Sequence, residues 1–194
     1  MPATGEPDMN VITSIAVGIG LAAACGFRIF VPFLVMGAAA RLGWLPLSAG
    51  FLWLGSDEAL LALAVATVVE AAAYKVPWLD HLLDLLASPA AVLAGALAAA
   101  AVVTDLPPLL RFAVAVVGGG GAAALVQGAT VLARLKSTAI TGGLANPLVA
   151  LVELVGSIVT SVLAVLVPFF LLVFLAALLG GLLFLARRSK GARA

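Results

Sequence analysis

Long apolar segments divide this chain and leave little room for a water-soluble fold. A helix that crosses a bilayer core, about 30 Å thick, needs about 20 apolar residues. Five segments reach or approach that length: Val11–Ala40, Ala59–Tyr74, Pro89–Val103, Leu109–Ala133 and Leu148–Ala186. Hydrophobic residues make up 64% of the chain, charged residues 10%, and the mean hydropathy is +1.27. These values predict an all-α, polytopic transmembrane helix bundle.

The segment Leu148–Ala186 is too long for a single span and contains Pro168 near its centre. Because proline breaks or kinks a helix, we expect two passes here and about six spans in total, with one long helix as the alternative. Six spans place most basic residues on one side, which predicts an inner (plasma) membrane protein with both termini cytoplasmic. These residues are Lys75, Arg134, Lys136, Arg187, Arg188, Lys190 and Arg193.

The chain divides into a polar N-terminal tail (1–10), a transmembrane domain (11–187) and a basic cytoplasmic tail (188–194). The first ten residues lack the basic start and the cleavage site of a removed signal peptide. The net charge of +1 is too small to attract nucleic acid. Cys25 is the single cysteine, so neither a disulfide within the chain nor a zinc motif is expected, and no cofactor is predicted.

Arg28 is the most informative charge, because it lies within the apolar segment Val11–Ala40, four residues before Pro32. A cation at that depth costs roughly 3 kcal/mol and therefore needs an acidic partner, water or an anionic ligand. Pro32 has no N–H to bond the Arg28 carbonyl, so we expect a broken or kinked helix here. Two interpretations remain open: a substrate-binding residue at a helix break, or an ion pair that fixes helix packing.

Carboxylates inside the other spans are candidates for ion coupling. Glu70 and Glu153 are both flanked by apolar residues, and either could neutralise Arg28 or carry a proton or sodium ion. Asp80 and Asp84 share one face of a predicted short interfacial helix over residues 78–86, as a solvated acidic face or a vestibule for cations. A complete metal site is not predicted, because the chain has only one histidine and one cysteine.

Small and neutral polar residues complete the candidate site. The run Gly118–Gly121 predicts close helix packing or a hinge. Gln127 adds a hydrogen-bonding group nearby. Ser137, Thr138 and Asn146 precede or begin a helix whose N-terminus would suit an anion, unless this is an ordinary loop. Ser88-Pro89 and Asn146-Pro147 both predict helix starts.

Several strings together resemble the domain-of-unknown-function family numbered 4126. They are Cys25-Gly-Phe-Arg-Ile-Phe-Val-Pro32, Glu70-Ala-Ala-Ala-Tyr74, Pro77-Trp-Leu-Asp80, Leu83-Asp84, Gly118-Gly-Gly-Gly121, Gln127-Gly128, Ser137-Thr-Ala-Ile-Thr-Gly-Gly143 and Asn146-Pro147. The resemblance covers nearly the whole chain and supports the membrane assignment, but it implies no activity.

The leading functional hypothesis is a small transporter or flippase for an anionic or amphiphilic substrate, coupled to protons or sodium. An oligomeric ion channel and a non-transporting membrane scaffold are the alternatives. An enzyme is not expected, because no nucleophile stands at a fixed spacing from a base. The predicted partners are the lipid bilayer, a small anionic or lipid-like substrate or a monovalent cation, and no nucleic acid. Weak internal matches leave open a 3+3 inverted repeat, and a homo-oligomer is also left open.

Overall fold

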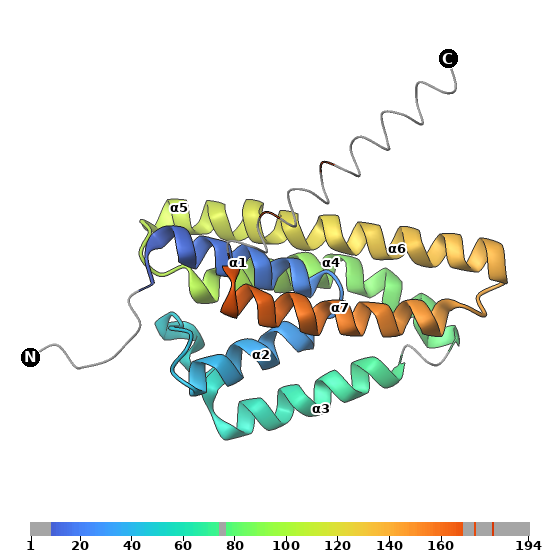
Figure 1. The fold of residues 1–194 in the computed structure, drawn as a ribbon, viewed down its shortest axis with the longest axis horizontal. Coiled ribbons are helices and arrows are strands. Elements are labelled where there is room, and N and C mark those ends of the chain that lie inside the picture. The colour runs from blue at the N-terminus through green and yellow to red at the C-terminus, as the bar shows by residue number, and fades with distance from the viewer. Residues whose placement is uncertain (1–8, 74–76, 169–172, 174–179, 181–194) are drawn as a thin grey trace, which may run out of the picture.

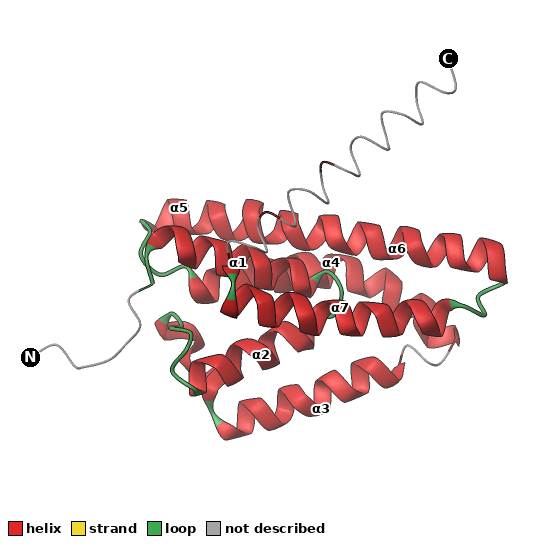
Figure 2. Cartoon of the chain, viewed as in Figure 1, coloured by secondary structure: helices red, strands yellow, loops and turns green. Residues whose placement is uncertain are grey.

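The structure is a computed structural model that describes residues 9–73, 77–168, 173 and 180, without the side chains of 77–86. Figure 2 shows that the described secondary structure is entirely helical, which confirms the all-α class. The helices are α1 (Val11–Cys25), α2 (Phe30–Arg41), η1 (Ala49–Gly55, 3-10), α3 (Asp57–Ala73), α4 (Pro77–Val102), α5 (Pro108–Ala113), η2 (Val114–Gly120, π), α6 (Gly121–Thr141) and α7 (Asn146–Leu166).

The first apolar segment is a helical hairpin and not a single span. α1 ends at Cys25, α2 begins at Phe30, and the chain reverses direction between them (Figure 1). Pro32 is the third residue of α2, where its missing N–H would have no partner within the helix, so the helix begins just before it. The predicted break beside Arg28 is confirmed, whereas the prediction that Val11–Ala40 crosses the membrane as one span is wrong.

Because the chain reverses, the first residues of α1 and the last residues of α2 lie at the same end of the bundle. Met9 and Arg41 line the same pocket, together with Asp105 from the loop after α4. From Pro108 to Thr141 the helix runs away from that end for about 50 Å. The described start of the chain therefore lies at the opposite end of the bundle from the end of α6, and the prediction that both termini are cytoplasmic stays a prediction.

The glycine run of the fourth apolar segment permits very close helix packing. A Cβ on Gly119 would lie 2.6 Å from the carbonyl oxygen of Gly95 in α4, and one on Gly95 would lie 2.8 Å from that of Gly119. The two backbones can approach this closely because neither residue has a side chain. The same run forms part of the π-helix η2 inside the helix that joins α5 to α6. The predicted close packing is confirmed.

Two predictions about α4 are wrong. α4 is continuous from Pro77 to Val102 and contains Pro89 in its interior, so Ser88-Pro89 does not begin a helix and residues 78–86 are not a separate one. A helix in apolar surroundings tolerates an internal proline when neighbouring groups satisfy the freed carbonyl. In contrast, α7 does begin at the predicted Asn146-Pro147 pair.

In the described part of the chain, two helices are long and apolar enough to cross a membrane: Pro108–Thr141 and Asn146–Leu166. A third is reached if η1 and α3, which are bent by 73°, count as one broken span. The count is below the predicted six. The first segment is split into helices of about 22 and 18 Å, and the apolar described part of α4, Ala87–Val102, is also short of a full span. α7 ends at Leu166, just before Pro168, and the second pass predicted after it lies outside the described residues.

Candidate functional site

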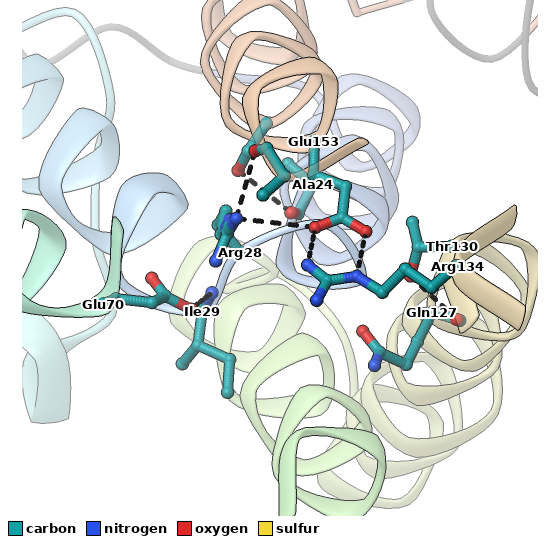
Figure 3. Close-up of polar contacts among 10 residues, drawn as sticks. Ala24, Arg28, Ile29, Glu70, Gln127, Thr130, Arg134 and Glu153 are labelled. Atoms are coloured by element: carbon teal, nitrogen blue, oxygen red, sulfur yellow. Dashed lines mark hydrogen bonds and ion pairs between the residues drawn. The ribbon is translucent and has the colours of Figure 1, made fainter. Parts of the chain in front are cut away.

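The N-terminus of α2 is capped by Glu70 from another helix. Its carboxyl group accepts a hydrogen bond of 2.9 Å from the N–H of Ile29 and one of 3.3 Å from the N–H of Phe30 (Figure 3). The first N–H groups of a helix have no partner within the helix and carry the positive end of its dipole. A carboxylate is well suited to this position, so Glu70 stabilises the beginning of α2 from across the bundle.

Arg28 lies on the other side of the break and turns toward α7. The side chain is about 1% exposed, its Nη2 donates a hydrogen bond of 3.0 Å to the carbonyl oxygen of Ala150, and the same atom lies 3.5 Å from Oε2 of Glu153. Arg28 also follows the C-terminus of α1, where the helix dipole is negative and favours a cation. The acid that Arg28 contacts is therefore Glu153, while Glu70 binds the adjacent backbone.

Glu153 is shared between two arginines. Nε of Arg134, on α6, donates to Oε1 of Glu153 at 2.8 Å, and Nη2 of Arg134 forms a close contact with Oε2 (Figure 3). All three side chains are buried. A buried carboxylate held by two guanidinium groups joins the break, α6 and α7 in one ion cluster, hereafter the ion triad (Arg28, Arg134 and Glu153). Removing Glu153 would leave two buried cations without their shared counter-charge, so the triad fixes how these helices pack.

Arg134 was expected at the cytoplasmic end of a span, and its place in the site was not predicted. The signal was present in the sequence, because Gln127, Thr130 and Arg134 follow the three- and four-residue spacing of a single helix face. All three are buried in α6. An arginine aligned with two polar residues on an otherwise apolar helix indicates a cation that faces the bundle interior.

The break is also fixed by contacts with α6 and α7 that involve no charge. A Cβ on Gly26 would lie 2.5 Å from the carbonyl oxygen of Ala123, so only glycine permits this approach to α6. Ser157 of α7 donates a hydrogen bond of 3.1 Å to the carbonyl oxygen of Ala24, in the last turn of α1. Five helices therefore meet at the break: α1, α2, α3, α6 and α7.

A groove of about 830 Å³ opens between α3 and α4 and ends at the capped N-terminus of α2. Apolar side chains form almost all of its wall. The residues that line it are Ile29, Phe30, Glu58, Leu61, Ala62, Val65, Ala66, Val69, Glu70, Ala73, Ala87 and Ala90. Glu70 belongs both to this wall and to the cap of α2. Arg28 does not line this groove, although the next residue does.

The other predicted substrate-binding residues fall into two groups. Gln127 is buried close to the break, since a Cβ on Gly26 would lie 2.9 Å from its backbone nitrogen. Thr138 and Asn146 bind each other instead, with Nδ2 of Asn146 donating to Oγ1 of Thr138 at 3.1 Å. Ser137 lies beside them, at the far end of α6, and seven residues (about 10 Å) separate Asn146 from Glu153.

The residues of this second group therefore do not join Arg28. Asn146 is the first residue of α7, because Ala145 occupies the cap position and its N–H donates to Oγ1 of Thr141. Asp80 and Asp84 belong to α4, but their side chains lie outside the described part of the structure, so their predicted role in ion coupling stays a prediction.

The described residues form helices only, two of these helices are apolar and long enough to cross a membrane, and buried ions lie at the break of the helical hairpin, a combination typical of a helical membrane protein with an internal polar site. The family model described as "Domain of unknown function (DUF4126)" matches residues 15–188, and the chain belongs to this family. No curated protein and no solved structure matches the chain.

Proposed function

We propose that this protein is a small integral membrane transporter or flippase for an amphiphilic substrate, in which Glu70 couples the occupancy of the groove to the position of the α1–α2 hairpin. The observation that carries the proposal is the double role of Glu70. Glu70 is one of the residues that line the apolar groove, and its carboxyl group accepts hydrogen bonds from the N–H groups of Ile29 and Phe30. A ligand or proton that engages this carboxyl group competes with the cap of α2.

The chemistry of the cap explains why such competition would move the helix. Without Glu70, two N–H groups at the start of α2 lose their acceptor in apolar surroundings, where no water replaces it cheaply. A proton on the carboxyl group removes the charge that the helix dipole favours. Glu70 is therefore the proposed coupling residue for a proton or a monovalent cation, whereas Glu153 is already held by two arginines.

Arg28 takes a different role from the anion contact expected from the sequence. It is bound to Glu153 and to the carbonyl oxygen of Ala150, which gives the α1–α2 hairpin a fixed support on α7. We therefore assign Arg28 to positioning the break next to Glu70, and the substrate contacts to the groove. Support of this kind lets one side of the break move while the other side stays in place.

The proposed topology has the end of α6 in the cytoplasm, because Lys136 and the basic tail of the chain would then obey the positive-inside rule. In this proposal the described start of the chain lies on the opposite face of the plasma (inner) membrane. A chain whose start and basic tail lie on opposite faces crosses the membrane an odd number of times, so this proposal departs from the six predicted spans and takes the segment after Pro168 as the last pass. The 3+3 inverted repeat stays a prediction.

The test is probe movement in proteoliposomes that contain the purified full chain. A phospholipid and an alkylamine, each with a dithionite-sensitive fluorophore, report transfer between leaflets as the fraction that becomes quenched. The wild-type protein should accelerate transfer of at least one probe, and Glu70→Gln should return the rate to that of protein-free vesicles. Asp105→Asn, which removes an acid that does not line the groove, should keep the wild-type rate.

The alternatives give different results in the same vesicles. A channel would pass monovalent cations down a gradient without moving either probe. A scaffold would leave both probes and the ion gradient at the protein-free rate, and this outcome would overturn the transport proposal.

A further inference from the structure

Among the described residues that line the groove, the charged ones are all acidic. They are Glu58 and Glu70, beside ten apolar residues, and the described lining includes no lysine or arginine. Both acids come from α3, and their offset of twelve positions corresponds to about 18 Å along the helix. A path with acidic groups at two depths and apolar walls between them is complementary to a molecule that combines a cation with an apolar chain.

We propose that the groove binds a cationic amphiphile, a long-chain alkylammonium or a lipid with an amine head group, that enters from the bilayer between α3 and α4. This inference deepens the proposed function, on which it rests, by naming the substrate class of the same groove. It also reverses the anionic substrate expected from Arg28, because that arginine is bound to Glu153 and does not line the groove.

The placement of the two acids matches the two parts of such a molecule. Glu58 is exposed in the first turn of α3, at the end of the bundle where Arg41 binds the neighbouring Asp57. A head group held there keeps its charge near the membrane surface while its chain lies along Leu61, Val65 and their neighbours.

Glu70 lies deeper, at the other end of the groove. A cation that moves from Glu58 to Glu70 would cover about 18 Å of a bilayer core of about 30 Å. A charge in hydrocarbon is costly without a counter-charge, so two carboxylates along the route reduce the barrier to its movement. At the inner position the cation meets the carboxyl group that caps α2, which links substrate position to the hairpin.

The side of the groove is open to the surroundings of the protein. Leu61, Val65 and Val69 are all more than half exposed although they line it. α3 packs mainly on α2 and η1 and lies apart from α4 along the groove (Figure 1). In a bilayer these side chains face lipid, so an amphiphile can enter laterally without first crossing the aqueous phase.

The test is competition for the groove in nanodiscs of an uncharged lipid, with the full chain. A photoreactive alkylammonium is cross-linked and its attachment sites are mapped by mass spectrometry. Three competitors of equal chain length differ only in the head group: an ammonium, an alcohol and a carboxylate. We expect cross-links in the Leu61–Val69 stretch of α3, and displacement by the ammonium at a concentration about fivefold lower than by the alcohol.

Glu58→Gln and Glu70→Gln should each reduce this preference for the ammonium, while displacement by the alcohol stays unchanged. Asp105→Asn should leave the preference intact, because Asp105 lines a different pocket. Equal displacement by all three competitors, preference for the carboxylate, or cross-links showing that a second copy of the chain fills the groove would overturn the inference. Preferential binding of the ammonium without probe transfer would leave this inference in place and overturn the transport proposal. Probe transfer without a preference for the ammonium would support transport and overturn this inference.

Discussion

Glu70 accepts a hydrogen bond of 2.9 Å from the backbone N–H of Ile29, so α3 supplies the cap of a helix that begins 40 residues earlier in the chain. The two helices that meet at the break have opposite needs. The end of α1 favours a cation and is followed by Arg28, whereas the start of α2 favours an anion and receives Glu70. Because the two charges come from different parts of the chain, the two sides of the break can respond to different signals.

Truncation of the cap should destabilise the hairpin locally. Glu70→Ala removes the acceptor of two N–H groups, and loss of a helix cap costs about 1 kcal/mol of the free energy of unfolding. Hydrogen exchange should therefore accelerate at residues 29–31 and change little in α7. Glu58→Ala is the matched control on the same helix, since Glu58 lies in the first turn of α3 and the N–H groups at the start of α2 bind Glu70. Equal acceleration in both variants would count against the capping role.

The ion triad should behave as a unit. Glu153→Met leaves two buried arginines without their shared carboxylate, and breaking a buried ion pair costs about 3–5 kcal/mol. The triple variant Arg28→Met, Arg134→Met, Glu153→Met removes all three charges and should be more stable than Glu153→Met alone. Thermal unfolding in detergent measures both variants.

The exposed pair at the bundle end is the comparison for the triad. Arg41→Ala breaks the contact with Asp57, and exposed ion pairs contribute at most about 1 kcal/mol. A loss from Glu153→Met no larger than that from Arg41→Ala would show that the triad does not support the fold.

Helix packing at the glycine pair gives a steric prediction. Gly119→Ala places a Cβ 2.6 Å from the carbonyl oxygen of Gly95, so the helices must separate, at a cost of about 1–3 kcal/mol. Gly121→Ala, two residues later, meets nothing within 4 Å and should be neutral or stabilising by up to about 1 kcal/mol. The thermal midpoints of the two variants should move in different directions. A Gly119→Ala protein as stable as Gly121→Ala would contradict this packing.

The hairpin makes a topological prediction that differs from that of a single first span. In a Cys25→Ala background, cysteines at Asn10 and Leu42 should react with an impermeant maleimide from the same side of sealed vesicles. A cysteine at Ile140, which is 83% exposed near the end of α6, should react from the other side. Labelling of positions 10 and 42 from opposite sides would restore the single span.

The break was predictable from local chemistry, whereas the reversal of the chain was not. Arg28 and Pro32 make an uninterrupted helix unfavourable, and that information lies within eight residues. The direction of the second helix depends on contacts with distant segments, such as Gly26 against Ala123 and Ser157 on Ala24. Sequence periodicity carries no signal for such contacts, since the partners are about 100 residues or more away.

For the charged residues, too, part of the site was predictable from local sequence and part depended on distant contacts. The need of Arg28 for an acid was predictable, and Glu70 and Glu153 were the right candidates, but the choice between them depended on which helix faces the break. Arg134 could have been recognised from its alignment with Gln127 and Thr130. The continuous helix through Pro89 could not have been recognised from the sequence, because proline is a local helix-breaking signal and the surroundings of α4 override it.

Hydrogen exchange at the N–H groups of Ile29 and Phe30, measured with and without a long-chain alkylammonium, tests most directly whether Glu70 links the groove to the hairpin. In the wild-type protein, a ligand that engages Glu70 should accelerate exchange at these two positions. In Glu70→Gln the exchange should already be faster, and the ligand should change it no further. Unchanged exchange in the wild-type protein, while cross-linking shows the groove to be filled, would contradict the account.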